Sequence, residues 1–168
     1  MSTLGIENIE HTNGTNAMTI NSDAVVSLPN IPYLIANTAV SKNVTPGGYT
    51  GTIIYDNVIS SRGILLNTTT GTFTVPLNGL YEITAAARLN SNLTYAYWQL
   101  INDDATSTVQ GNKLIMTHGS TAGFTTPNGS AMYNLVASTN YKITIGANSA
   151  SSVAVSEGQT WLDIKLIG

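Results

Sequence analysis

Apolar and polar residues alternate with a period of two along much of this chain, which is the pattern of half-buried β-strands. The pattern is clearest in residues 71–89, where Phe73 and Val75 alternate with threonines. Pro76 interrupts the alternation because it has no N–H to donate, and Asn78-Gly79 tolerates the positive φ of a turn. Beyond the turn, one face carries Tyr81, Ile83, Ala85, Ala87 and Leu89, and the other carries Glu82, Thr84 and Arg88. The segment therefore predicts two strands joined as a hairpin.

Similar strand patterns recur at intervals of roughly 8–14 residues, which is the spacing of an antiparallel sandwich or barrel. They cover residues 33–36, 52–59, 95–101, 109–116, 131–136, 141–145, 153–155 and 161–167, and residues 65–71 lead into the predicted hairpin. No segment has a 3.6-residue apolar stripe long enough to predict a helix. We therefore predict an all-β, antiparallel sandwich of about ten strands.

The first 31 residues differ from the rest of the chain. Residues 14–29 read as two short strands around a polar Asn-Ser-Asp turn, with too few apolar residues to bury a core. We predict an N-terminal arm over 1–31 and a head domain over 32–168. The alternative is a surface hairpin that packs on the head. In the first case the apolar side chains of the arm mediate attachment, and these are Met18, Ile20, Val25 and Leu28.

The pattern G-x-F-x-V-P-x-x-G-x-Y over residues 71–81 resembles the signature strand pair of the globular head domain of complement, in the tumour necrosis factor-like jelly-roll superfamily. A loop that begins with Asn67 and ends with Gly71 matches the same family. The turn at residues 137–140 departs from it, since relatives often have glycine-aspartate there. Over about residues 31–168 the resemblance implies a jelly roll whose last strand lies in the middle of a sheet.

The arm carries a second, shorter resemblance. The form x-A-M-T-I-x-x-x-x-x-V, which starts at Asn16, is similar to segments in the shafts and N-terminal arms of bacteriophage fibre proteins.

Two strands are apolar on both faces. Residues 95–101 place Tyr95, Tyr97 and Ile101 on one face and Ala96, Trp98 and Leu100 on the other. Residues 161–167 place Trp161 and Ile167 on the face opposite three aliphatic residues. One face fills the sandwich, and the second needs another layer, because dense exposed aromatics are uncommon on monomers. The resemblance implies a trimer, since complement-type heads and phage fibre tips form three-fold assemblies. We therefore predict that the trimer interface or the core includes Tyr95, Tyr97, Trp98 and Trp161; coverage by loops or by the arm is the alternative.

Composition narrows the possible partners. Charged residues make up only 9% of the chain, against about 25% in typical soluble domains. Threonine, asparagine and serine instead supply roughly a third, which favours strands and turns. The net charge of −3 with six basic residues offers no footprint for nucleic acid, and no apolar run has the length of a membrane-spanning helix. Without cysteine or a signal-like start, the chain is expected to be assembled in a cytoplasm.

Candidate chemistry is sparse. The two histidines, His11 and His118, read as solvated loop residues, and no catalytic or phosphate-binding motif is present. Asp103-Asp104 reads as a turn, with a calcium site as the alternative. Glu82 and Glu157 lie too far apart in sequence to be paired as a glycosidase dyad. We predict neither catalytic residues, cofactor nor metal, and hence no enzyme.

The resemblances and the composition together lead us to expect a virion structural protein of a tailed bacteriophage. It would be a trimeric capsid decoration or head-fibre protein, whose arm binds other virion proteins and whose outer surface is formed by loops 43–51, 103–112 and 118–129. The alternative is a tail-fibre tip that recognises a host surface glycan. A third class, a glycan hydrolase, would need a clustered carboxylate pair.

Overall fold

The chain is built of β-strands in the computed structural model, which describes residues 8–10, 16–20, 22–23, 26–28, 30–47, 51–103, 115–118, 123–149 and 151–168. It divides into two compact units, Met1–Ile31 and Pro32–Gly168. All strand pairings are antiparallel, which confirms the predicted fold class. The described ranges contain no helix that is long and apolar enough to cross a membrane.

The first unit is a small three-stranded sheet in the order β1-β2-β3, formed by β1 (Asn8–Glu10), β2 (Asn16–Ile20) and β3 (Val26–Ser27). Ser22 and Asp23 form the turn between β2 and β3. Strand β1 was not predicted, since it contributes little apolar pattern of its own. Of the predicted attachment residues, Met18 and Ile20 are half-buried, Leu28 is exposed, and Val25 lies outside the described residues.

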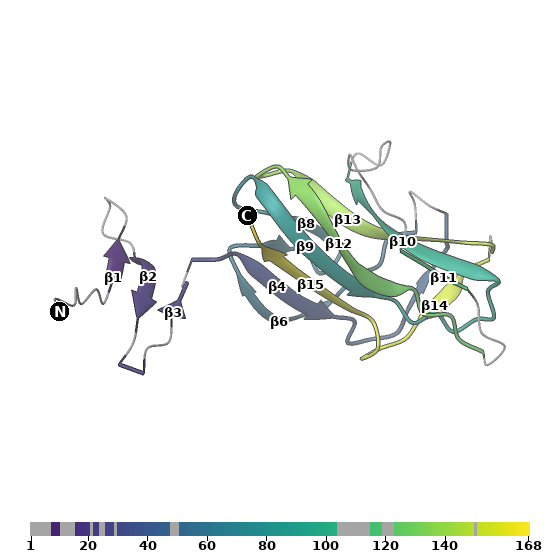
Figure 1. Cartoon of the computed structure of the whole chain (residues 1–168). Coiled ribbons are helices and arrows are strands. Elements are labelled where there is room, and N and C mark those ends of the chain that lie inside the picture. Colours follow the sequence, from purple (N-terminus) through teal and green to yellow (C-terminus); the bar gives the residue numbers. More distant parts are fainter. Residues whose placement is uncertain are drawn as a thin grey trace. The chain divides into compact units, whose positions relative to one another are not determined.

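The second unit is a jelly-roll sandwich of two five-stranded sheets (Figure 1). One sheet has the order β11-β10-β13-β8-β7, the other has the order β12-β9-β15-β4-β6, and β14 and β5 form a separate pair. The strands are β4 (Tyr33–Asn37), β5 (Lys42–Val44), β6 (Asn57–Arg62), β7 (Leu65–Leu66), β8 (Thr72–Thr74), β9 (Gly79–Ala86), β10 (Tyr95–Asn102), β11 (Ile115–His118), β12 (Asn128–Leu135), β13 (Asn140–Ala147), β14 (Val153–Val155) and β15 (Trp161–Leu166).

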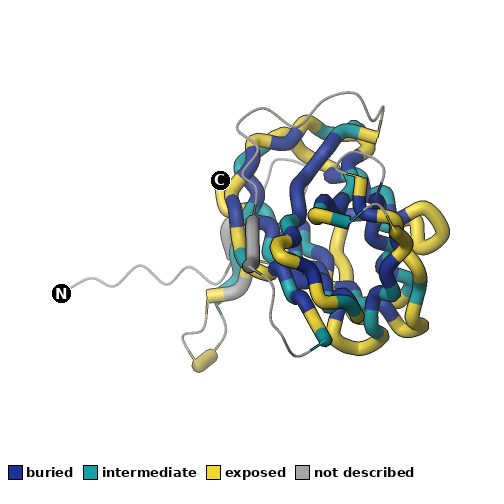
Figure 2. Tube along the Cα trace, turned by 90° about the vertical axis from the view of Figure 1, so that its right-hand side faces the viewer, coloured by how far each residue is buried: buried dark blue, intermediate teal, exposed yellow. Residues whose placement is uncertain are grey.

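A single hydrophobic core joins the two sheets. It takes Phe73, Trp98 and Ile143 from one sheet and Tyr81 and Ile164 from the other, and all five are buried. Because side chains alternate across a strand, the same strands present their polar positions outward. Figure 2 shows buried segments among the strands of this unit and exposed ones both in its loops and along its strands.

The predicted hairpin at residues 72–86 is wrong, although both strands exist. Strand β8 pairs with β7 and β13, whereas β9 pairs with β12 and β15 in the other sheet. The segment between them therefore crosses the sandwich. The Tyr81 hydroxyl donates to the Leu77 carbonyl at 3.0 Å, and the Ala137 N–H donates to Asn78 Oδ1 at 2.7 Å. Alternation cannot distinguish the two arrangements, since both place Phe73 and Tyr81 in the core.

The last strand occupies the middle of its sheet, as the resemblance implies. Strand β15 lies between β9 and β4, and its residues Leu162 and Ile164 are fully buried. The pairing continues past the strand, because the Ile167 N–H donates to the Leu80 carbonyl at 2.8 Å.

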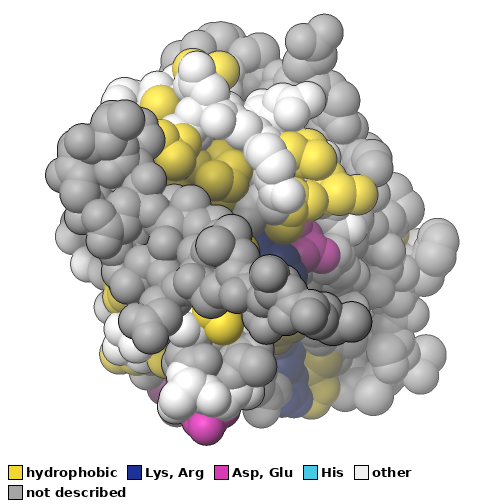
Figure 3. All heavy atoms as spheres, turned by 60° about the vertical axis from the view of Figure 1, so that its left-hand side comes forward, with side chains coloured by type: hydrophobic (Ala, Val, Ile, Leu, Met, Phe, Trp, Pro, Cys, Tyr) yellow, Lys and Arg dark blue, Asp and Glu magenta, His cyan; other side chains and the backbone are white. Residues whose placement is uncertain are grey.

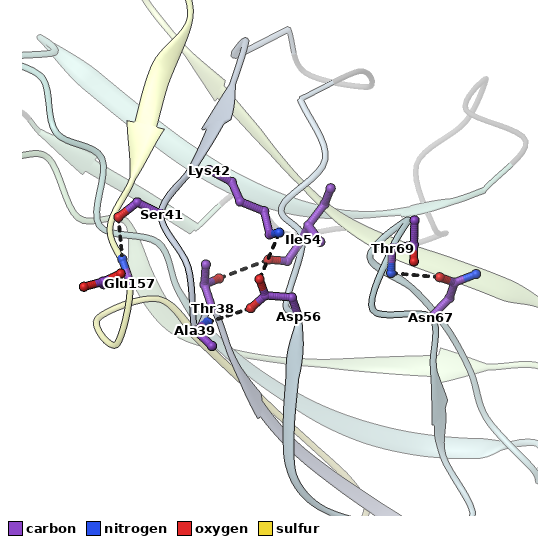
Figure 4. Close-up of polar contacts among 9 residues, drawn as sticks. All are labelled: Thr38, Ala39, Ser41, Lys42, Ile54, Asp56, Asn67, Thr69 and Glu157. Carbon is purple, nitrogen blue, oxygen red and sulfur yellow. Dashed lines mark hydrogen bonds and ion pairs between the residues drawn. The ribbon is translucent and has the colours of Figure 1, made fainter.

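Two turns depend on a positive φ. The loop from Asn67 to Gly71 is closed by the Asn67 side chain, whose Oδ1 accepts N–H bonds from Thr69 at 2.9 Å (Figure 4) and from Thr70 at 3.1 Å. Gly71 ends this loop with φ +74°. In the turn at 137–140, Ser138 takes φ 60°, the conformation that glycine adopts without strain.

A polar latch formed by Asp56, Lys42 and Ala39 joins the segments that follow β4 and precede β6 (Figure 4). One Asp56 oxygen accepts the Ala39 N–H at 2.6 Å, and the other lies 2.9 Å from Lys42 Nζ. Burial raises the pKa of Asp56, but the hydrogen bonds from Lys42 and Ala39 outweigh it and hold the pKa below its ordinary value. The ionised latch is therefore favoured by folding.

We expect Asp56→Asn to cost about 1 kcal/mol of unfolding free energy at neutral pH, because the amide keeps one acceptor but loses the charge. A lowered pKa stabilises the fold above the unfolded value of about 3.9 and loses its contribution as the pH falls through the folded value. Urea unfolding of both proteins should therefore give curves that converge in acid. Glu157→Gln, which removes an exposed carboxylate that forms no ion pair among the described residues, is the control; a gap between Asp56→Asn and the native chain that persists in acid would contradict the role of the charge.

Candidate functional site

The outward surface of the sheet β12-β9-β15-β4-β6, called here the open face, is the most distinctive surface of the described head. Strand register arranges it in three rows across the sheet. The first row is Asn128, Ala86, Trp161, Asn37 and Asn57; the second is Ser130, Thr84, Asp163, Ile35 and Ser60; the third is Met132, Glu82, Lys165, Tyr33 and Arg62.

Large apolar side chains are exposed on the open face. Trp161 is 39% exposed, Ile35 37% and Met132 52%, and they come from three different strands. Figure 3 shows hydrophobic side chains gathered beside basic and acidic ones on one side of the molecule. An aromatic and aliphatic surface of this kind on a sheet is typical of a contact with another protein surface.

The polar groups of the open face largely pair with one another. Asn57 Nδ2 donates to Asn37 Oδ1 at 2.8 Å, the Thr84 and Ser130 hydroxyls lie 2.5 Å apart, and Lys165 Nζ lies 2.8 Å from Glu82 Oε2. The hydroxyls of Tyr33 and Ser60 are 3.0 Å apart. A surface that docks here would therefore leave few of these groups without a hydrogen bond.

The outward side of the other sheet is closed at its centre. Gln99 on β10 is 4% exposed, and its register partner Thr144 on β13 is fully buried. Ile101, on the same side of β10, is also fully buried. This sheet therefore lacks an accessible centre against which a second subunit could pack.

The structure does not bring the four predicted interface or core residues together. Trp98 is fully buried in the core, and its Nε1 has no hydrogen-bond partner. Tyr95 and Tyr97 lie on the outward side of the closed sheet, where the Tyr97 ring covers Gly146. Only Trp161 lies on the open face. The period-two pattern gave each residue its side of a strand, but not the sheet to which that strand belongs.

Sequence reasoning missed a contact between Arg88 and Phe124 at the end of the open face. The Arg88 guanidinium carbon lies 3.6 Å from the centre of the Phe124 ring, and Phe124 is exposed. Arg88 extends the outward alternation of β9, since Ala87 and Leu89 on either side are buried. The sequence placed Arg88 on the polar face of this strand but contained no signal for its partner in a distant loop.

Asp163 is the acidic residue at the middle of the open face. It stands opposite Thr84 on β9 and Ile35 on β4. Burial raises the pKa of Asp163 above its ordinary value, Lys165 opposes this shift, and Glu82 adds to it. Among the described residues no hydrogen bond or ion pair holds its carboxylate.

The described residues hold no candidate metal centre. They include no cluster of three or more metal-ligating acids or histidines. Asp103 forms an ion pair with Lys142 at 3.2 Å, whereas Asp104 and the His11 and His118 side chains lie outside the description. Burial raises the pKa of Tyr55, so this phenol stays neutral. Much of the predicted loop surface also lies outside the description, namely 48–50, 104–112 and 119–122.

No protein-family model and no curated protein matches this chain. Solved structures do match it in fold. Murine APRIL at pH 8.0 superposes with a TM-score of 0.58 at 10% identity over 82% of this chain and 99% of APRIL. The globular domain of a zebrafish complement 1qA protein gives 0.59 at 14% identity over 82% and 98%. Eiger TNF from S. frugiperda gives 0.53 at 12% identity over 82% and 92%.

These likenesses support the jelly-roll fold that the residue 71–81 pattern implied, in its tumour necrosis factor and complement-head form. At such low identity they establish the fold alone. The function must be argued from the surfaces of this chain.

Proposed function

We propose that this chain assembles as a homotrimer through the open face and serves as a structural head domain. The observation that carries the proposal is the contrast between the two sheets. Trp161, Ile35 and Met132 are exposed on one, whereas the centre of the other is closed at Gln99 and Thr144. Association would bury this apolar area, which is the main driving force for stable subunit contacts.

The chemistry of the open face suits a permanent interface. Trp, Tyr, Met and Arg are enriched in such contacts, and the face carries Trp161, Tyr33, Met132 and Arg62 in its rows. Its amides and hydroxyls pair internally, so their burial would cost little. The resemblance to trimeric complement-type heads suggests three copies rather than two.

We place this trimer, as part of the same proposal, on the virion of a tailed bacteriophage after assembly in the host cytoplasm. It would be a capsid decoration or head-fibre protein. The support is the sparsely charged, amide-rich composition and a separate N-terminal unit whose Val26 and Leu28 are exposed. A three-stranded unit of this size needs a surface to pack on, and another virion protein would supply it.

A tail-fibre tip that binds a host glycan is the second candidate. It is favoured by the exposed aromatic side chain of Tyr95 at the start of β10, whose backbone N–H donates to Asn148 Oδ1 at 3.2 Å. Sugars stack on aromatic rings and bond to amides, so a glycan array probed with the full-length protein separates the two roles: specific binding favours the tip, and no binding favours decoration.

The experiment that tests the proposal is a mass measurement by light scattering on the full-length chain and on residues 32–168. The full-length chain is expected at three times 17.7 kDa, and the shorter chain at three times its own, smaller mass. The shorter chain keeps the whole second unit and should remain folded, but it should no longer join the particle. A monomer in both cases would refute assembly through the open face, and loss of folding without residues 1–31 would refute the division of roles.

A further inference from the structure

Among the described residues of the extended open face, Asp163 and two arginines, Arg88 and Arg62, form no ion pair. Among the described basic residues, Lys42, Lys142 and Lys165 form ion pairs, whereas Arg88 and Arg62 do not. Among the acids of this face, Glu82 is paired with Lys165 and Asp163 is left without an ion pair. Charges left without a partner at an interface are costly once water is excluded, so they indicate where a neighbouring subunit supplies the counter-charge.

Asp163 is set in the middle strand of the sheet. Thr84 faces it from β9, and Ile35 faces it from β4. The charged groups nearby are Lys165, two residues along β15, and Glu82 on β9, and these two bind each other at 2.8 Å. The partial burial that already raises the pKa of Asp163 would become complete under a docked subunit. Within the interface, the Asp163 carboxylate would then need a cationic side chain from that subunit, or it would have to be protonated.

The side chain of Arg88 is positioned to bind a carboxylate. Its guanidinium stacks on the Phe124 ring, and its backbone is fixed because the Arg88 N–H donates to Thr160 Oγ1 at 3.2 Å and the Ser156 N–H donates to the Arg88 carbonyl at 2.9 Å. Stacking leaves the N–H edge of the guanidinium free and restricts its rotamers. An aromatic-backed arginine is a common energetic centre of protein interfaces.

The two groups are too far apart to pair within one chain. Arg88 is four residues beyond Thr84, the residue opposite Asp163, which amounts to roughly 13 Å along the strand. In a closed ring of three copies each contact is heterologous, so one part of a subunit's surface meets a different part of the next. We propose that Arg88 of each subunit forms an ion pair with Asp163 of the neighbouring subunit, an inference that rests on the trimer proposed above.

Arg62 provides the matched control. It lies on the same face, at the edge strand β6, with its guanidinium carbon 5.4 Å from the centre of the Tyr33 ring, and it too forms no ion pair among the described residues. Unlike the half-buried Arg88, it is exposed, so it can keep its hydration at the edge of the face. Reversing its charge should therefore disturb the assembly much less than reversing Arg88.

The test is the dissociation of full-length trimers on dilution, followed by sedimentation and light scattering. Arg88→Asp and Asp163→Arg should each raise the concentration of half-dissociation at least tenfold, since opposing a charge at a contact costs more than about 1.4 kcal/mol. The double variant Arg88→Asp/Asp163→Arg should restore most of the loss, because the pair is re-formed with its ends exchanged. Arg62→Asp should change the concentration by less than about threefold.

A second set of variants, in which the charges are neutralised, is used if a charge-reversed variant does not fold. Circular dichroism checks that every variant is folded; if Asp163→Arg is not, the cycle is run with Arg88→Gln and Asp163→Asn. If Arg88 and Asp163 form a pair, their losses are coupled, so trimers of the double variant dissociate no more readily than those of either single variant. Additive losses in the cycle, or an Arg62→Asp loss equal to that of Arg88→Asp, would overturn the pairing. A native chain that is monomeric would instead overturn the trimer itself.

Discussion

A chain that ends at Thr160 is expected not to fold. The missing residues form β15, which lies between β9 and β4 and contributes the fully buried Leu162 and Ile164. Its removal would leave β9 and β4 each unpaired on one side, split the sheet between them and open the core. The loss exceeds the roughly 5–15 kcal/mol that holds a domain together. Far-UV circular dichroism and the dispersion of amide resonances measure the outcome.

The deletion of residues 1–31 is the control, since it removes more residues but leaves Pro32–Gly168 intact. A shorter truncation after Leu166 should be intermediate, because it removes the hydrogen bonds that join Ile167 and Gly168 to Leu80 but keeps the buried strand. If the chain that ends at Thr160 gave a cooperative unfolding transition like that of the native protein, the central position of β15 would be wrong.

Replacing Gly71 with alanine should destabilise the head by about 3 kcal/mol or more. Its φ of +74° is strained for any residue with a Cβ, and the added carbon would overlap the Ile53 carbonyl oxygen. That carbonyl belongs to the backbone of the segment that runs beside β13, where the Ile53 N–H donates to the Ile143 carbonyl at 3.0 Å. The clash therefore cannot be relieved by a side-chain rotation, and two neighbouring segments must shift. Urea unfolding of the purified variant measures the loss.

Gly158→Ala is the matched control for this prediction. Gly158 has a similar φ of +64°, but nothing lies within 4 Å of an added Cβ. Its cost should be only the strain of the left-handed conformation, about 1 kcal/mol. Equal losses at the two glycines would show that conformation alone matters, and that the close approach of Ile53 to Gly71 does not.

The environment of Gly71 also explains why the residue 71–81 pattern carried so much information. Gly71 is required by the backbone that passes over it, and Phe73, Val75 and Tyr81 are all buried. These four fixed positions of the pattern therefore each meet a constraint of the sandwich. The pattern could not show that β8 and β9 belong to different sheets, because both sheets face the same core.

The interface residues show the same division. Trp98 and Trp161 both lie in strands that the sequence shows to be apolar on both faces. Trp161 is exposed on the open face, whereas Trp98 is enclosed between the sheets. Tyr95 and Tyr97 belong to the sheet whose centre is closed. Which apolar face remains accessible depends on the strand order and on what covers each sheet, and neither leaves a trace in local periodicity.

The sequence by itself determined the all-β class, most strand positions, the side of the strand on which Arg88 and Glu82 lie, and the turn-forming Asn67 and Gly71. These are local properties, set by alternation along one strand and by the allowed φ of single residues. Only the tertiary structure decided that β8 and β9 belong to different sheets, that Arg88 meets Phe124, and that Asp163 forms no ion pair among the described residues of the open face. Those are contacts between residues distant in sequence, which arise only when strands from all parts of the chain are ordered into two sheets.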